Sequence, residues 1–364
     1  MKSFSLFILA TIVFVLPEVK GQEVPTRISG KFDKTYGRYL ITLSKSVDGY
    51  YCAENIDLSD SIILQDEKFE VNYNLPLHSF VTLYFAHHYV MSFYADSAND
   101  IKFEILTDSA QNPGRVFFFG ANAAANELLA NRGLLYPYGN RKKEIEKIII
   151  EAKNAQVAIN QLQSILKKYK DYLNELFASQ KISGTCYEAF NAETEQRLLF
   201  CCKDILWQNA MGALEVTMSK SEINKVINYL FTLYDPFDKR YFAATCIIDN
   251  IAAKCILINY NIIPRVINSP KDTWKSFAHL FNFLAPYMGV YDLAPKSVQL
   301  YLAGNALLKC ITYQSLTRDE FMSVYTTYKK LYPASPYNQI IEKHLPDNPF
   351  SKSSSIIRPN ISTH

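Results

Sequence analysis

The stretch YVMSFYADSANDIKFEILTDSAQNPGRVFFFGANAAANELL, residues Tyr89–Leu129, decides the fold. It contains two β-like apolar runs, Val90–Tyr94 and Ile101–Leu106, which a short polar turn separates. A third run, Val116–Phe119, ends at Gly120, and a helical pattern follows at once. Strands are expected before Gly120 and helices after it, so the stretch predicts the joint between two parts of the molecule.

The chain before this joint has the pattern of a β domain. Short alternating runs follow one another without helices between them, which is typical of an antiparallel sandwich or an open barrel. Arg27–Phe32 and Tyr39–Ser44 are expected to form the first hairpin, and Phe80–Phe85 alternates in step with Val90–Tyr94. The sequence therefore predicts a β-sandwich-like domain over residues 22–120.

The chain after the joint has helical periodicity, so the fold class is α+β, with an all-α domain at residues 121–345. A long helix is expected from about Lys142 to Gln180, and its apolar seam predicts packing on a neighbouring helix of the same chain rather than on a second copy. Capping signals, Ser219-x-x-Glu222 and Thr317-x-x-Glu320, open further helices, as does Ser335-Pro336. Residues 346–364 have the composition of a disordered tail.

The N-terminus has the pattern of a secretory signal peptide. Lys2 precedes the apolar run Phe4–Leu16, which is too short to cross a bilayer, and small residues precede a cut between Gly21 and Gln22. Residues 1–21 are therefore predicted to be removed. The mature protein is expected in the periplasm, or elsewhere in the cell envelope or outside the cell, without a transmembrane segment.

Charge and composition narrow the possible partners. The 364 residues carry a formal net charge of +3, and no concentrated basic face is visible, which argues against a nucleic-acid partner. The 25 tyrosines and 23 phenylalanines are enough to build large cores. The oligomeric state stays open.

The seven cysteines contain no C-x-x-C motif, and their odd number leaves at least one thiol unpaired. Most lie in apolar helical surroundings and are expected to be buried thiols. Cys186, expected in a loop near the helix that carries Cys201 and Cys202, is the best candidate for a disulfide, with Cys201 as its partner. A vicinal bond between Cys201 and Cys202 is disfavoured, because neighbouring side chains diverge on a helix.

No catalytic constellation is visible in the sequence. G-x-S-x-G and Gly-rich phosphate loops are missing, and His87-His88 has no carboxylate or cysteine at the spacing of metal ligands. We therefore predict no metal, no cofactor and no catalytic residue. A ligand groove is expected between sheet and helices, and position alone selects Tyr94, Arg115 and Asn122 as its residues.

The runs FYADSANDIKFEI and RVFFFGANAAANELL resemble the N-terminal region of exported TlpA-type, thioredoxin-like fusion proteins of Bacteroidota, whose β region is DUF4369-like. Gly120, Asn122 and Asn126 match the strand-to-helix junction of that family. Ala98-Asn99-Asp100 replaces its Pro-Gly-Asp turn, and Asn tolerates the positive φ that such a turn requires. The segment FMSVYTTYKKLYPASPYNQIIEKHL also matches in style, so the resemblance covers about Val24 to Leu345.

In those proteins a thioredoxin-like domain with a reactive Cys-x-x-Cys pair follows the last helix, and no residue here corresponds to that pair. The resemblance implies a non-catalytic, exported binding or interaction module, with a thioredoxin-like or other envelope protein as partner. The alternative is a partner or a truncated remnant in a thiol-disulfide redox system of the envelope.

Overall fold

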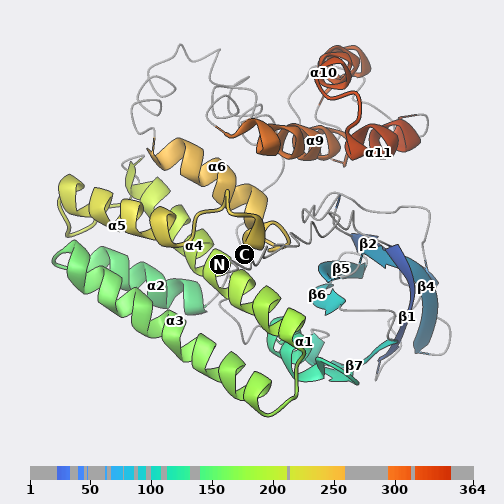
Figure 1. Cartoon of the computed structure of the whole chain (residues 1–364), viewed down its shortest axis with the longest axis horizontal. Helices are drawn as coiled ribbons and strands as arrows, with labels where there is room; N and C mark the ends of the chain where they lie inside the picture. Colours follow the sequence, from blue (N-terminus) through green and yellow to red (C-terminus); the bar gives the residue numbers. More distant parts are fainter. Residues whose placement is uncertain are drawn as a thin grey trace, which may run out of the picture.

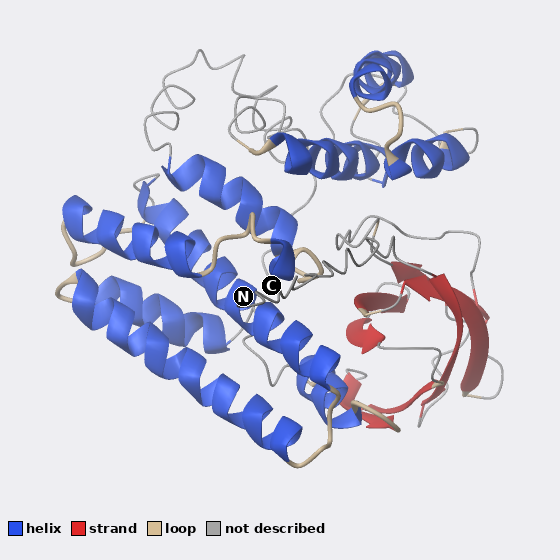
Figure 2. Ribbon diagram, viewed as in Figure 1, coloured by secondary structure: helices blue, strands red, loops and turns tan. Residues whose placement is uncertain are grey.

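The computed structural model describes residues 23–32, 40–44, 47, 62–63, 67–76, 78–85, 89–95, 100–107, 113–131, 140–210, 214–258, 294–312 and 316–345. The predicted signal peptide, His87-His88 and the predicted C-terminal tail lie outside these residues. The sequence pattern also predicts a strand at residues 50–56 and a helix at residues 274–284, and both ranges lie outside the described residues. The described chain is a mixed α+β protein, as predicted, with its strands gathered at one side of the molecule (Figure 1, Figure 2).

The described strands form two four-stranded sheets rather than a barrel. Sheet A has the order β4-β1-β7-β8, with the bounds β1 Glu23–Phe32, β4 Lys68–Pro76, β7 Ile101–Thr107 and β8 Pro113–Phe119. Sheet B has the order β3-β2-β5-β6, with the bounds β2 Leu40–Ser44, β3 Ile62–Ile63, β5 Ser79–Phe85 and β6 Tyr89–Ala95.

The pairing of the first strand differs from the prediction. The expected hairpin of β1 with β2 is wrong, because these strands belong to different sheets. Strand β1 instead lies between β4 and β7, and its pairing with β7 is parallel, with Ile28 opposite Ile101. The prediction of a purely antiparallel β domain is therefore wrong at this pairing. The hairpin of β5 with β6 is confirmed.

Gly30 explains why β1 occupies the centre of sheet A. It lies opposite Phe69 of β4 and opposite Phe103 of β7, and a Cβ at this position would come within 3.0 Å of both rings. The two ring centroids are 5.6 Å apart. A glycine flanked by two aromatic residues allows the rings to close over the strand, a packing that turn signals near β1 do not encode.

The two sheets bury one face each in a shared apolar core. The Phe93 ring of sheet B lies 6.1 Å from the Phe118 ring of sheet A, measured between centroids. Alternation along each strand sends every second side chain inward. The core residues are Ile28, Leu43, Phe69, Tyr73, Leu75, Val81, Leu83, Met91, Phe93, Ala95, Ile101, Phe103, Ile105, Val116 and Phe118.

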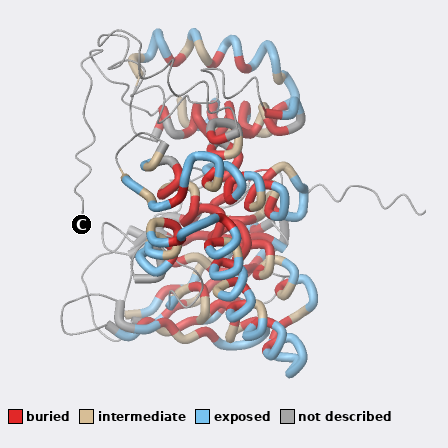
Figure 3. Tube along the Cα trace, turned by 90° about the vertical axis from the view of Figure 1, so that its left-hand side faces the viewer, coloured by how far each residue is buried: buried red, intermediate tan, exposed pale blue. Residues whose placement is uncertain are grey.

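The helices follow in chain order and make up the rest of the described molecule, with buried positions along their inner faces and exposed positions outside (Figure 3). Helix α4 contacts α2, α3, α5 and α6 and is the central helix of this part (Figure 1). The bounds are α1 Ala123–Ala130, α2 Asn140–Glu151, α3 Ala155–Ala178, α4 Gly184–Ala210, α5 Lys220–Leu233, η1 Lys239–Tyr241, α6 Ile247–Ile258, α9 Lys296–Thr312, α10 Arg318–Leu331 and α11 Pro336–His344.

The long helix predicted from Lys142 to Gln180 is wrong, because the chain breaks between α2 and α3. Helix α2 ends at Glu151, and the Asn154 side chain accepts a hydrogen bond from the Val157 N–H at 3.0 Å, which caps α3. The predicted packing within the chain is confirmed, because the buried face of α3 packs against α4 and α5.

The other capping signals behave as predicted. The Ser219 hydroxyl caps α5, and Thr317 forms a complete capping box with Glu320 at the start of α10. The Ser335 hydroxyl accepts from the Tyr337 N–H, and Pro336 is the first residue of α11. The sequence pattern predicts a helix from about Ala192, and the observed helix α4 begins earlier, at Gly184.

Helices α9, α10 and α11 enclose a core of their own, which also takes in Val47 from the strand region. Helix α9 faces two cores, because its Val298 and Leu302 pack with the residues of α2–α6 while Leu307 packs with α10 and α11. The C-terminal helices are thereby tied to both other parts of the described chain.

Candidate functional site

The joint predicted from the sequence is built around α1, and its first contact is with sheet B. The Tyr94 N–H donates to Asn126 Oδ1 at 2.8 Å, and Asn126 Nδ2 donates to the Tyr94 carbonyl at 3.3 Å. A side-chain amide carries the same donor and acceptor as a peptide group. Asn126 therefore pairs with the edge strand β6 as a neighbouring strand would.

The same helix also pairs with the edge of sheet A. The Val116 N–H donates to Asn131 Oδ1 at 2.7 Å, and Asn131 Nδ2 donates to the Val116 carbonyl at 2.7 Å. Two residues further along β8, the Phe118 N–H donates to Glu127 Oε1 at 3.1 Å. An open sheet edge invites pairing with other chains. Helix α1 satisfies backbone groups at one edge of each sheet.

Asn122 connects this joint to the helical part. It has a left-handed backbone, with φ of 58°, and follows Gly120, whose φ is 92°. Both residue types tolerate this conformation, which turns the chain sharply from β8 into α1. The Asn122 side chain is buried and its Oδ1 accepts a hydrogen bond at 2.7 Å from the Ser183 N–H, just before α4.

Two of the three residues selected by position lie at the joint, and the third does not. Tyr94 is 3% exposed, and its ring packs edge-on against Phe190 of α4. Asn122 is the N-cap residue of α1 and contacts the chain just before α4. Arg115 is exposed on the outer face of sheet A, with its guanidinium 4.7 Å from the centroid of the Phe117 ring. Strand alternation separates Arg115 from the inward-facing Val116.

A second polar arrangement, which the sequence reasoning missed, lies inside the helical part. The Glu193 side chain of α4 is fully buried and accepts a hydrogen bond at 2.6 Å from Arg197 Nε. The same carboxylate accepts from the Thr245 backbone N–H at 2.7 Å and from the Thr245 hydroxyl. These contacts join α4 to the segment just before α6.

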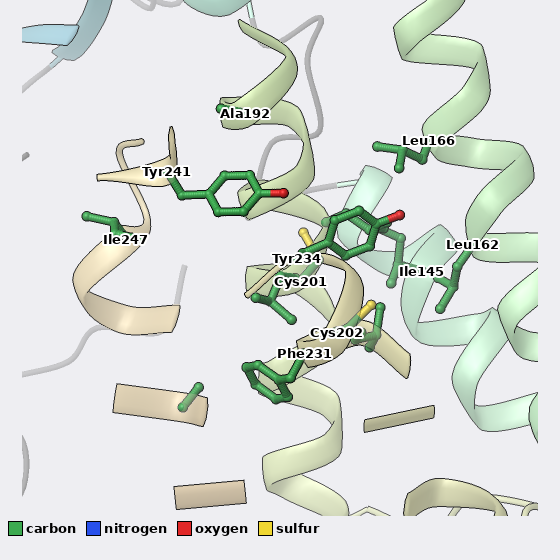
Figure 4. Close-up of a cluster of buried hydrophobic side chains, with 14 of the residues drawn as sticks. Ile145, Leu162, Leu166, Ala192, Cys201, Cys202, Phe231, Tyr234, Tyr241 and Ile247 are labelled. Atoms are coloured by element: carbon green, nitrogen blue, oxygen red, sulfur yellow. The ribbon is translucent and has the colours of Figure 1, made fainter. Parts of the chain in front are cut away.

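The neighbouring Glu195 makes a parallel set of contacts. Its carboxylate pairs with Lys170 of α3 and accepts from the Tyr241 hydroxyl at 2.6 Å. Burial and the hydrogen bond to Glu195 raise the pKa of Tyr241, so this phenol stays a donor. Tyr241 and Tyr234 lie on either side of α4 near Cys201 (Figure 4).

Amide contacts extend this network to α6. Asn250 Nδ2 donates to the Gln196 carbonyl and to Gln196 Oε1, each at 2.8 Å, and Gln196 Nε2 donates to the Tyr234 carbonyl at 3.3 Å. With the two glutamates, these contacts link α4 to α3, α5, η1 and α6. The donors of the neighbouring elements hold both carboxylates, so the arrangement ties these helices together.

One signal in the sequence points to this network. Glu193 and Arg197 are four residues apart, the spacing of an ion pair on one helix face. The apolar residues that follow Arg197 show that the helix is buried. A charged pair within such a helix is buried with it.

The cysteines do not form the expected pair. Cys186 lies in the first turn of α4 rather than in a loop, and Cys201 lies on the same helix. Fifteen residues of helix separate them by about 22 Å, far beyond the reach of a disulfide. Both are buried thiols, as are Cys202, Cys246 and Cys310. Burial raises the pKa of the Cys202 and Cys246 thiols, which disfavours the reactive thiolate.

Among the residues that the structure describes, His, Cys, Asp and Glu side chains form no group of three or more that could hold a metal ion. In that part of the chain no helix combines the length and apolar character needed to span a membrane.

The fold and the joint define a mixed α+β protein in which one short helix fixes two sheets to a helical body. Comparisons of the chain with protein-family models, curated proteins and solved structures give no match.

Proposed function

We propose that this chain is an exported, non-catalytic binding or interaction module. It consists of a β-sandwich domain, residues 22–120, joined directly to an α-helical domain, residues 121–345. The sequence resemblance to the accessory region of thioredoxin-like fusion proteins motivates this function.

The observation that carries the proposal is the outer face of sheet A, held in a fixed place by the joint. Side-chain amides of α1 secure β6 and β8, and Asn122 secures the turn before α4. The inner face of sheet A is buried in the core, while Phe119 on its outer face is 45% exposed. Pre-organised surfaces bind at a lower entropic cost than mobile ones.

The export part of this proposal is motivated by the signal-peptide pattern of residues 1–21. Strand β1 starts at Glu23 and pairs with β4 along its length, so a cut between Gly21 and Gln22 leaves the whole strand intact. Mass spectrometry of the protein from the organism that makes it tests this point. We expect Gln22 as the N-terminal residue, and an intact Met1 in the cell-associated protein would contradict export by this route.

The binding function is tested by capture. Mature protein, residues 22–364, is incubated with a native envelope extract whose thiols are alkylated at lysis, and bound material is identified. Recovery of one glycan, peptide or protein at a fixed stoichiometry, without a covalent link, supports the module. Turnover of a substrate by the purified protein would contradict it.

The second candidate is a role in thiol-disulfide exchange with a thioredoxin-like partner. The odd number of cysteines favours it, because at least one thiol remains for a mixed disulfide. A partner recovered in the same experiment through a reducible covalent bond would select this function instead.

A further inference from the structure

The hairpin of β7 and β8 presents a distinct surface on the outer face of sheet A. In the register of the hairpin, Lys102 lies opposite Phe119, Glu104 opposite Phe117 and Leu106 opposite Arg115. Residues paired in this way stand side by side on one face of a sheet. We name these six residues the β7–β8 patch.

The patch combines exposed apolar surface with positive charge. Phe119 and Leu106 are 45% and 43% exposed, which places them among the exposed large apolar residues of the described chain. Lys102 Nζ lies 5.6 Å from the centroid of the Phe119 ring, and the Arg115 guanidinium lies 4.7 Å from that of Phe117. Cations over aromatic rings keep their charge available to a further anion.

Neither cation of the patch is neutralised within the described part of the chain. The ion pairs there include none with Lys102 or Arg115. Arg27, on the same face of sheet A, is by contrast paired with Asp100 and lies 3.7 Å from Glu70. The sheet supplies carboxylates to its arginine on β1, whereas no described carboxylate forms an ion pair with either cation of the hairpin.

We propose that the β7–β8 patch binds an extended, acidic peptide segment of a partner protein, an inference that rests on the proposed binding function. Lys102 and Arg115 lie at opposite ends of the patch, four register positions apart, which corresponds to about 14 Å along a strand. Carboxylates four residues apart in an extended peptide have the same spacing.

The residue at the centre of the patch narrows the charge pattern expected of the partner peptide. Glu104 lies between the two cations and favours a basic side chain midway between the two carboxylates. Acidic, basic and acidic residues at alternate positions of the peptide complement the patch, and the exposed rings cover its apolar side chains. The same glutamate opposes a uniformly anionic surface such as a lipid bilayer.

The experiment selects peptides from a random twelve-residue library displayed on phage, using mature protein as bait. Wild-type protein is compared with Lys102→Glu/Arg115→Glu. The matched control, Lys143→Glu/Lys168→Glu, makes the same charge change at exposed lysines of α2 and α3. Synthetic peptides from the selection are then titrated against all three proteins, and sedimentation measures self-association.

We expect selected peptides to carry two acidic residues four positions apart around a basic one. Their affinity should fall at least about tenfold in Lys102→Glu/Arg115→Glu and stay unchanged in the control.

Three outcomes would overturn the patch assignment: selected peptides without acidic residues, peptides that bind the variant as tightly as wild type, or no selected peptide at all. Envelope capture that persists in the variant would leave the proposed function standing and remove only this surface. Self-association that the variant abolishes would assign the patch to a second copy of the chain.

Discussion

At the residue scale, the joint depends on asparagine side chains whose amides form hydrogen bonds with the backbone of edge strands, as a neighbouring strand would. Asn126 lies in α1 and Asn131 is the C-cap residue of this helix, five positions further on, which turns their side chains by about 140° around the helix axis. One amide therefore faces β6 and the other faces β8. A carboxylate, which has no donor, cannot replace either amide without losing the hydrogen bond to a backbone carbonyl.

Substitution Asn126→Asp tests this role. The change keeps the acceptor for the Tyr94 N–H but places a carboxylate oxygen against the Tyr94 carbonyl, in a site that is 4% exposed. We expect the free energy of unfolding to fall by about 2–3 kcal/mol, measured by urea denaturation.

The matched control is Asn131→Asp, the same change at an exposed residue with the same pair of backbone contacts. Water can hydrate the carboxylate there, so we expect a loss of about 1 kcal/mol or less. Equal losses at the two positions would show that burial at Asn126 does not set the cost.

At the element scale, α5 helps to begin α3. Glu222 lies in the first turn of α5, where its backbone N–H donates to the Ser219 hydroxyl. Its side chain reaches across and accepts from the Ala155 N–H at 2.7 Å, at the first position of α3. The sequence signal Ser219-x-x-Glu222 predicts one capped helix, and the glutamate caps a second one.

This contact makes stability depend on pH. The hydrogen bond from Lys225 and then the one from the Ala155 N–H lower the pKa of Glu222 below its usual 4.5. A lowered folded-state pKa adds stability above the unfolded-state value, and that stability is lost as the pH falls through the folded-state value. Between pH 7 and pH 3 we expect wild-type protein to lose more unfolding free energy than Glu222→Gln. Urea denaturation at both pH values measures the difference.

The control for this experiment is Glu188→Gln, at an exposed glutamate of α4 that makes no ion pair in the described chain. It should follow the wild-type pH dependence. A Glu222→Gln variant that also follows it would mean that the carboxylate adds nothing at the start of α3.

Packing between α9 and α11 gives a second prediction at this scale. Gly304 lies within α9, where a Cβ would come within 3.0 Å of the fully buried ring of Tyr337. Alanine gains about 1 kcal/mol of helix propensity, whereas overpacking costs about 1–3 kcal/mol. We expect Gly304→Ala to lower the melting temperature, followed by circular dichroism.

The same substitution at Gly184 serves as the control. A Cβ there meets only Phe177, at 3.9 Å, so Gly184→Ala should be neutral or slightly stabilising. A Gly304→Ala protein as stable as wild type would show that the Tyr337 ring can shift without cost.

Local signals in the sequence predicted the helix caps and the change from strands to helices at Gly120. The polar and glycine residues that produce them act within a few positions. The parallel pairing of Ile28 with Ile101 could not be predicted in this way, because it depends on rings that meet over Gly30 from distant strands. The break before α3 was hidden because Ala152 and Ala155 continue the buried apolar pattern across it.

At the scale of the whole molecule, polar contacts hold together parts with separate apolar cores. The sheets share one core, α2–α6 form most of another, and α9–α11 enclose a third. The candidate site could be predicted only in its location, since Tyr94 and Asn122 adjoin α1. The glutamates of α4 escaped prediction because their burial follows from the helices packed around them.

Thiol reactivity is the measurement that separates the proposed binding role from the proposed redox role. Cys52 and the Cys255 side chain lie outside the described residues, so the informative protein is Cys52→Ser/Cys255→Ser, which keeps the five buried thiols. Exchange chemistry needs an exposed thiolate, whereas burial raises the pKa of Cys202 and Cys246. We expect the five thiols of the Cys52→Ser/Cys255→Ser variant to react with a disulfide reagent on the order of a hundredfold more slowly in the native state than in urea. Their reaction requires opening of the core. The same measurement on wild-type protein gives the reaction rates of Cys52 and Cys255, which the variant lacks. A single thiol of the variant that reacts rapidly at neutral pH would identify a redox centre within α4 or its neighbours and favour the partner role in thiol-disulfide exchange.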